Sequence, residues 1–92
     1  MTELQIQSAI RSYLEDKGWF VVANDNKRRM GVKKGRADLT CIGPAGAFME
    51  IEVKGKSGVQ SEAQVAYQAE LWKRGHVYLV CRSVEDVKAA LK

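Results

Sequence analysis

Residues 38–54 read DLTCIGPAGAFMEIEVK, and this stretch predicts a β-hairpin. Residues 38–42 and 47–54 contain aromatic, β-branched and other apolar side chains, which favour strands. Between them, residues 43–46 read GPAG, which is a strong turn signal. Two strands joined by a short turn pair in antiparallel fashion, so each strand of this hairpin has the other as its neighbour in the sheet.

Charged and apolar residues alternate in the second strand of this hairpin. Because successive side chains point to opposite faces of a strand, Glu50, Glu52 and Lys54 should share one face. Ile51 and Val53 should then point into the core. An exposed strand whose charges pair only with one another is the alternative interpretation of this alternation.

Two carboxylates and an ammonium group are expected to meet at one end of the sheet. A turn at residues 43–46 brings Asp38 roughly opposite Glu52, close to Lys54. Adjacent carboxylates repel each other, and Mg²⁺, which prefers oxygen ligands and retains several waters, relieves that repulsion. A bound metal polarises a phosphate and acidifies water, while a lysine stabilises developing negative charge or positions the water. This grouping therefore indicates phosphodiester hydrolysis.

The segments around the hairpin predict three helices and two further strands. Ser or Thr followed three residues later by Gln predicts a capping box at Thr2 and at Ser61. The expected elements are a helix over 3–17, a strand over 19–23, the hairpin, a helix from Ser61 to about Arg74, a strand over 76–81 and a short helix capped by Ser83. This order predicts an α/β fold with an α+β mixed sheet, and a length of 92 residues favours one domain over 1–92. Apolar side chains in the second helix, Val65, Tyr67, Leu71 and Trp72 among them, are expected to supply packing surface.

Six basic residues without an intervening acid lie between residues 27 and 36, in a segment that we expect to be a mobile loop. They are Lys27, Arg28, Arg29, Lys33, Lys34 and Arg36. The other basic residues number nine against eleven acidic ones, so this segment carries the whole positive balance of a chain with net charge +4. Such a cluster attracts a polyanion such as DNA. A solvated loop that only aids solubility is the alternative.

The cysteines and the histidine argue against a zinc site. Cys41 and Cys81 lie inside predicted strands, there is no Cys-x-x-Cys pair, and His76 is the only histidine. Two buried free thiols suit a reducing cytoplasm. We find no signal peptide and no apolar run approaching the roughly 20 residues that span a bilayer, so we expect a cytoplasmic protein without a membrane partner.

The order of these motifs resembles the VRR-NUC branch of the PD-(D/E)XK nucleases. Gly-x-x-Asp-Leu is present at residues 35–39, Glu-x-Lys at 52–54 and Ser-x-x-Gln at 61–64. Residues 77–83 are similar to the tail pattern Val-x-x-Val-Arg-Ser, with Cys81 where that pattern often has Val or Arg. The resemblance covers nearly the whole chain. It implies a restriction-endonuclease-like α-β-β-β-α-β core in the minimal, stand-alone form found in phages and bacteria.

The resemblance also implies roles for individual residues. Asp38 and Glu52 would be metal ligands, together with the carbonyl of Val53, and the metal would be Mg²⁺ or Mn²⁺. Lys54 would be the catalytic lysine. The family uses an acid on the first helix, for which Glu3 is the best match; alternatively, Glu3 only favours the helix N-terminus electrostatically.

Two further residues have open roles. Gln64 would point into the site from the second helix, or it would only complete the capping box with Ser61. Glu50 lies outside the family pattern and either assists metal binding or pairs with a basic side chain.

The implied activity is a structure-selective endodeoxyribonuclease that cuts branched DNA, such as the four-way Holliday junction. The resemblance implies a homodimer in the cytoplasm of a bacterial or phage-infected cell, and no nucleotide cofactor is expected. Trp19, Tyr67 and Trp72 would suit a dimer interface, or they belong to an ordinary core. The first alternative is a non-catalytic basic DNA-binding module that retains the nuclease fold. A small scaffold that docks on an acidic protein is the second.

Overall fold

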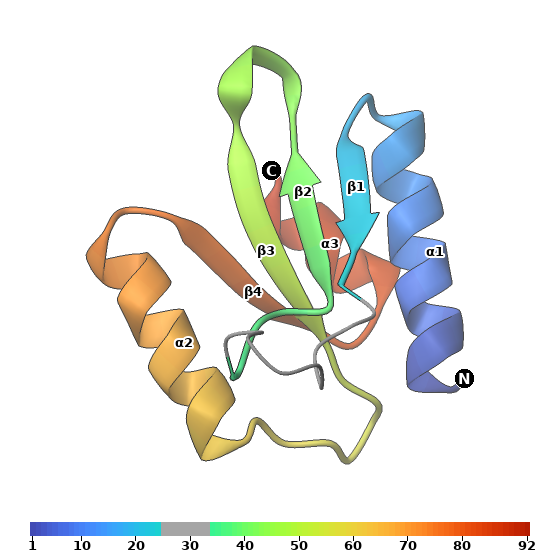
Figure 1. The fold of residues 1–92 in the computed structure, drawn as a ribbon. Helices are drawn as coiled ribbons and strands as arrows, with labels where there is room; N and C mark the ends of the chain where they lie inside the picture. Colours follow the sequence, from blue (N-terminus) through green and yellow to red (C-terminus); the bar gives the residue numbers. More distant parts are fainter. Residues whose placement is uncertain (25–33) are drawn as a thin grey trace.

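The elements follow the predicted order (Figure 1). The computed structural model describes residues 1–24 and 34–92, so Lys27, Arg28, Arg29 and Lys33 and the loop expected there lie outside the described residues. The elements are α1 (Glu3–Asp16), β1 (Phe20–Ala23), β2 (Leu39–Ile42), the 3₁₀ turn η1 (Pro44–Gly46), β3 (Phe48–Val53), α2 (Glu62–Lys73), β4 (Val77–Cys81) and α3 (Val84–Ala90).

The four strands form one mixed sheet in the order β1-β2-β3-β4. The first three strands pair in antiparallel fashion, and β4 is parallel to β3 because α2 connects the two. Leu39 is paired with Ile51 across β2 and β3, so one step further along the same register Asp38 is level with Glu52. The hairpin prediction and the α+β mixed sheet are both confirmed.

One face of the sheet is covered by α1 and α3, which lie together on that side (Figure 1). Ile6, Ile10 and Leu14 of α1 pack against the sheet at the spacing of one helical face. Ile51 and Val53 are buried in this core, as the alternation predicts. Both capping boxes are present, and the Ser83 hydroxyl caps α3.

The opposite face carries the charged side chains of β3 and is only partly covered by α2. The Tyr67 ring of α2 lies 5.9 Å from the ring of Tyr78 in β4, and the Trp72 indole N–H donates to the Tyr78 carbonyl at 3.2 Å. The apolar side chains expected on α2 are only partly covered, since none of its residues is buried and Trp72 is 58% exposed. The reason is that α2 lies mainly over the edge strand β4, so little of its own surface meets the sheet.

No helix in the described parts of the chain has the length and apolar character to cross a membrane.

Gly35 allows the segment before β2 to approach the start of α2. Its φ is +83°, and an added Cβ would lie 2.1 Å from the Ala63 carbonyl oxygen. We therefore predict that Gly35→Ala lowers the free energy of unfolding by more than the ~1–2 kcal/mol expected for left-handed backbone strain alone. Chemical denaturation measures this loss. Gly46→Ala is the matched control, because Gly46 has φ +79° with nothing within 4 Å. Equal losses in both variants would contradict the close approach.

Candidate active site

Asp38 and Glu52 lie side by side where β2 and β3 begin to diverge. Asp38 Oδ2 accepts a hydrogen bond from the backbone N–H of Val53 at 2.8 Å, so its side chain reaches across to the neighbouring strand. Glu52 is 2% exposed. A buried carboxylate is costly unless a charge or a hydrogen bond compensates it, so this position needs a partner. The sequence-predicted meeting of the two acids is therefore present in the structure.

Lys54 is the cation at this end of the sheet. Its ammonium nitrogen lies 3.4 Å from Glu52 Oε2, and only 13% of its side chain is exposed. Its backbone N–H donates to the Cys81 carbonyl at 3.0 Å, which extends the pairing of β3 with β4 by one residue. The three residues singled out from the sequence thus form one cluster, with Lys54 alongside Glu52.

Tyr78 is a site residue that sequence reasoning missed. Its hydroxyl lies 3.4 Å from Glu52 Oε1 and 3.4 Å from the Gly35 carbonyl, and the residue is buried. Burial, followed by the nearby Glu52 carboxylate, raises the pKa of Tyr78, so the phenol stays protonated and can donate. Alternation in β4 together with the parallel pairing of β3 and β4 could have placed Tyr78 on this face.

A second polar cluster lies further along the same face and includes Glu50. The buried Glu50 carboxylate accepts a hydrogen bond from the Thr40 hydroxyl at 2.6 Å and lies 3.7 Å from the Arg36 guanidinium. Asn24 donates to the Thr40 hydroxyl and to the Ala37 carbonyl, both at 3.0 Å. Glu50 therefore pairs with a basic side chain, and its assistance in metal binding stays a prediction. Arg36, expected to contact DNA, is directed toward this pair.

Gln64 makes the contacts of its alternative role, whereas Glu3 makes a contact outside its own helix. Glu3 Oε2 accepts a hydrogen bond from the backbone N–H of Gly55 at 3.1 Å, so the first helix presents this acid to the loop after Lys54. Gln64 and Ser61 exchange the two hydrogen bonds of a capping box. Within residues 1–24 and 34–92, no three His, Cys, Asp or Glu side chains lie close enough to hold a metal ion together. The roles of Glu3 in metal binding and of Gln64 in catalysis stay predictions.

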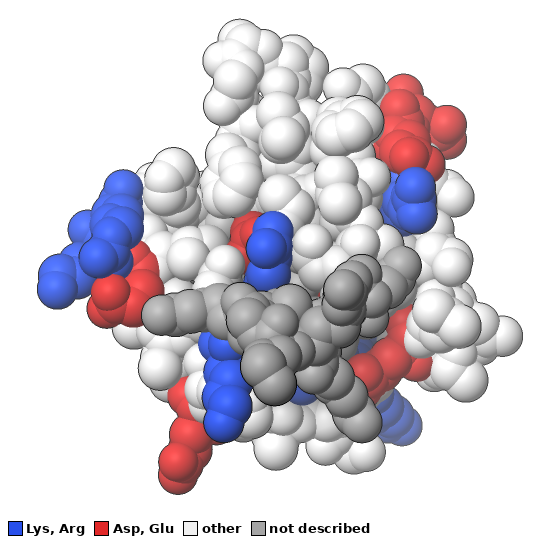
Figure 2. Space-filling model, viewed as in Figure 1, with Lys and Arg blue, Asp and Glu red and all other residues white. Residues whose placement is uncertain are grey.

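The charged side chains are unevenly distributed on this face (Figure 2). The surface over the hairpin end of β2 and β3 is largely uncharged, whereas Lys, Arg, Asp and Glu side chains lie nearer the opposite end of the sheet. Lys34 is exposed there, at the edge of the described chain. Figure 2 shows the described cations at several places on this face, including its left side, so they do not mark the carboxylate end by themselves.

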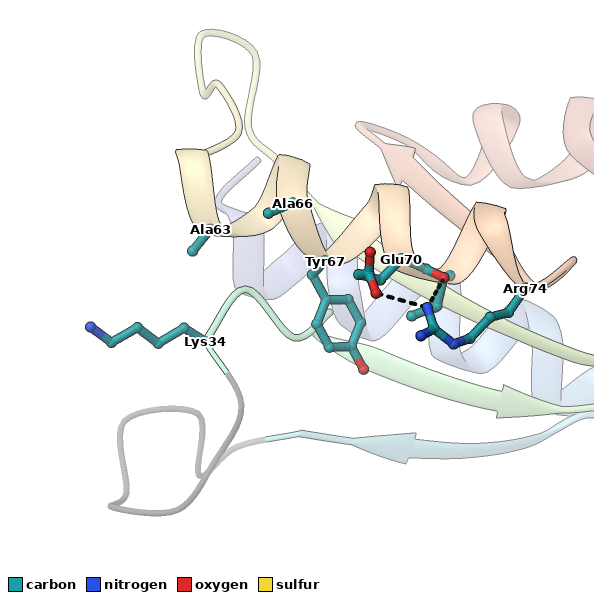
Figure 3. A pocket seen from close by; sticks show the side chains of 7 residues that line it. Lys34, Ala63, Ala66, Tyr67, Glu70 and Arg74 are labelled. Carbon is teal, nitrogen blue, oxygen red and sulfur yellow. Dashed lines mark hydrogen bonds and ion pairs between the residues drawn. The ribbon is translucent and has the colours of Figure 1, made fainter.

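A cavity of about 590 Å³ lies under α2, next to the carboxylate clusters (Figure 3). Its lining consists of Lys34, Ala63, Ala66, Tyr67, Glu70, Leu71 and Arg74. Glu70 and Arg74 form an ion pair at 2.8 Å along its rim. Tyr67 lies between the cavity and the Tyr78 ring, which is 5.9 Å away. Burial, followed by the interaction with the Glu50 carboxylate, raises the pKa of Tyr67 to about 12. The cavity adjoins the site without including Asp38 or Glu52.

Cys41 and Cys81 are buried free thiols. Burial is the main cause that raises the pKa of each to about 12, with the neighbouring Glu50 and Asp86 carboxylates adding to it, respectively. Thiolate is the reactive form of cysteine, so neither side chain is suited to nucleophilic chemistry near neutral pH.

The Arg36–Glu50 pair generates a stability prediction. Arg36→Met leaves the buried Glu50 carboxylate without its cation, so the free energy of unfolding should fall, and Glu50→Gln in the same chain should recover part of the loss. In a double-mutant cycle by chemical denaturation we expect a coupling free energy of about 0.5–3 kcal/mol. Additive losses within error would show that the two side chains do not interact. Arg11→Met is the control, because Arg11 makes an exposed ion pair with Glu15 at 3.4 Å, and such pairs contribute little.

Known structures with this fold point to one family. A solved VRR-NUC domain superimposes with a TM-score of 0.80 at 25% sequence identity, over 99% of this chain and 95% of that chain. A second structure, of a VRR-NUC domain protein, has a TM-score of 0.76 at 22% identity over 99% and 85% of the two chains, and at that identity it shows the fold alone. No protein-family profile and no curated protein matches the chain. The fold, the position of Asp38, Glu52 and Lys54, and the structural match over the whole chain support the identification of this chain as a VRR-NUC domain, which is a nuclease-type domain.

Proposed function

We propose that this chain is a Mg²⁺- or Mn²⁺-dependent endodeoxyribonuclease that hydrolyses phosphodiester bonds in branched DNA, such as four-way junctions. One observation carries the proposal. Asp38, Glu52 and Lys54 meet at one end of the sheet, with Asp38 bonded to the Val53 N–H at 2.8 Å and Lys54 3.4 Å from Glu52. Lysine beside two carboxylates, in a chain with the VRR-NUC fold, suits a metal-dependent hydrolysis of phosphate esters.

The residues at this end of the sheet fit a hard divalent cation. Asp38 and Glu52 offer carboxylate oxygens, which are the ligands that Mg²⁺ and Mn²⁺ prefer. The N–H and C=O of a strand residue point toward the same neighbouring strand, so we expect the Val53 carbonyl on the side where its N–H meets Asp38. These two side chains and the carbonyl would hold the metal. When bound, the metal would polarise the scissile phosphate and acidify a water.

The protein's own side chains would then orient the reacting groups. Lys54 carries its ammonium next to Glu52 Oε2, where it would position a water or stabilise the additional negative charge of the transition state. The Tyr78 hydroxyl would donate to the remaining oxygen of Glu52 and hold that carboxylate in one orientation.

Basic side chains are proposed to contact the DNA backbone. Lys34 is exposed and lines the cavity under α2. Four cations of the predicted basic segment precede it in the chain, and Arg36 follows it. Phosphate contacts position a protein without reading base identity, so they are compatible with selection by DNA shape. The preference for branched DNA comes from the family resemblance, and the following experiment tests it.

We predict metal-dependent cleavage of a labelled four-way junction, faster than that of a linear duplex of equal length, in Mg²⁺ or Mn²⁺ but not in chelator. Lys54→Ala should lower the rate by about 10²–10³-fold, as the loss of one transition-state contact typically does. Asp38→Asn and Glu52→Gln should abolish cleavage and leave DNA binding largely intact, because they are metal ligands rather than phosphate contacts. Gel analysis of the products and a binding titration give the two readouts.

The alternative functions predict different results. A junction that is bound in a salt-sensitive manner but never cut in either metal would favour the non-catalytic DNA-binding module. If the junction is neither bound nor cut, the remaining hypothesis is a small scaffold that docks on an acidic protein. Equal rates on junction and duplex would retain the nuclease and reject its preference for branched DNA.

We also propose that two copies of this chain associate, so that one dimer can cut two strands. Phe20, Val22 and Ile42 form an exposed apolar strip on the same face as Thr40 and Glu50, over the part of that face that α2 does not reach, and Phe20 is 67% exposed. A small domain buries a modest fraction of its apolar surface by itself, and a second copy is a common means of covering the rest.

Sedimentation velocity should therefore give twice the chain mass of 10.3 kDa. Phe20→Glu places a charge in the apolar strip and should shift the protein to the monomer. Val59→Glu is the control, because Val59 is 79% exposed in the loop before α2 and lies outside the strip. A wild-type monomer at micromolar concentration would reject the dimer, and a Phe20→Glu dimer would place the interface elsewhere.

A further inference from the structure

The chain turns sharply immediately after Lys54. The Gly58 N–H donates to the Gly55 carbonyl at 3.2 Å, which closes a four-residue turn over residues 55–58. This turn packs on the stem of the lysine, since an added Cβ at Gly58 would lie 3.4 Å from Lys54 Cδ and 3.4 Å from Glu3 Oε2. The position of the turn therefore limits where the Lys54 side chain can go.

The Arg82 side chain contacts both ends of this turn. Its guanidinium donates from one nitrogen to the Gly55 carbonyl and from the other to the Gly58 carbonyl, the latter at 2.7 Å. Arg82 follows β4 directly, and its own N–H donates to Asp86 Oδ2 at 2.8 Å in the first turn of α3. The backbone that carries the guanidinium is thus anchored to both the sheet and α3.

Glu3 holds the same turn from a third element. Its carboxylate accepts from the Gly55 N–H, while Arg82 donates to the carbonyl of the same residue. Both polar backbone groups of Gly55 are therefore bonded, one to α1 and one to the β4–α3 junction. A planar guanidinium that donates two hydrogen bonds loses less conformational freedom per bond than a lysine, which makes arginine suitable for such a clamp.

We propose that Arg82 is a positioning residue for the reaction, which acts by clamping the 55–58 turn so that the Lys54 ammonium stays beside Glu52. The inference deepens the proposed nuclease function and rests on it. The hydrogen bonds of Arg82 go to Gly55, Gly58 and Asp86, so its removal should affect the placement of Lys54 rather than the binding of the metal. A displacement of about 1 Å at a catalytic group can lower a rate by about 10²-fold.

Arg82 is also exposed, so a direct phosphate contact is the competing role. The two roles differ in what they change. Loss of a phosphate contact weakens DNA binding and reduces its salt dependence, whereas loss of the clamp lowers the rate after DNA is fully bound.

The test compares the full-length wild type with Arg82→Ala, Arg82→Lys and Lys56→Ala. Lys56 is an exposed cation in the same turn and controls for the loss of positive charge. Three quantities are measured: the single-turnover cleavage rate at saturating junction DNA, the dissociation constant for Mn²⁺ by calorimetry, and the hydrogen-exchange rate of the Gly58 amide. For Arg82→Ala we expect a rate about 10–100-fold lower, unchanged Mn²⁺ binding and faster exchange of Gly58. Arg82→Lys should be intermediate and Lys56→Ala should match the wild type.

Several results would overturn this role. They are a full rate at saturating DNA in Arg82→Ala, a loss confined to DNA affinity, a loss of Mn²⁺ binding, or unchanged exchange of Gly58. An inactive wild type would be a different failure, because it rejects the proposed nuclease together with any catalytic role for Arg82. In that case the exchange rate of Gly58 in Arg82→Ala still reports whether the guanidinium holds the turn.

Discussion

The candidate site depends on the register between β2 and β3. With Leu39 opposite Ile51, the next pair along the ladder is Asp38 and Glu52, so the two carboxylates become neighbours without any long-range search. A slip of one residue would turn Glu52 into the apolar core and Ile51 onto the polar face. This is strongly unfavourable because the carboxylate would be buried without the partners it has on the polar face. The same burial that stabilises the sheet therefore maintains the site.

The two faces of this sheet carry side chains of different polarity. The face toward α1 and α3 contains the apolar core, while the face toward α2 contains Thr40, Glu50, Glu52 and Tyr78, all of them buried. Buried polar groups require partners, and here they find them mostly among one another and in Arg36 and Lys54. Such a network restricts the side chains to one arrangement, and a metal-binding site requires that restriction.

Three segments that are distant in the sequence converge on the end of β3. Glu3 comes from the start of α1, Gly35 packs under the start of α2, and Arg82 reaches back from the end of β4. Glu3 and Arg82 contact Gly55, which follows Lys54, while Gly35 precedes Asp38 and packs on the Ala63 carbonyl. The site is thus supported from α1, α2 and β4, although its principal side chains come from a single hairpin. This arrangement explains how a chain of 92 residues can hold reactive groups firmly.

The order of elements, the hairpin and the meeting of Asp38, Glu52 and Lys54 could be predicted from the sequence, because turn signals and the period-2 alternation of a strand are local properties. Both capping boxes were predictable for the same reason. Three contacts could not be predicted from the sequence. Glu50 pairs with Arg36, Tyr78 contacts Glu52, and Arg82 donates hydrogen bonds to the turn after Lys54. The sequence also did not show how little of the apolar surface of α2 would be covered by the sheet. These features depend on the parallel pairing of β4 and the docking of helices, which join residues far apart in the chain and have no local signal.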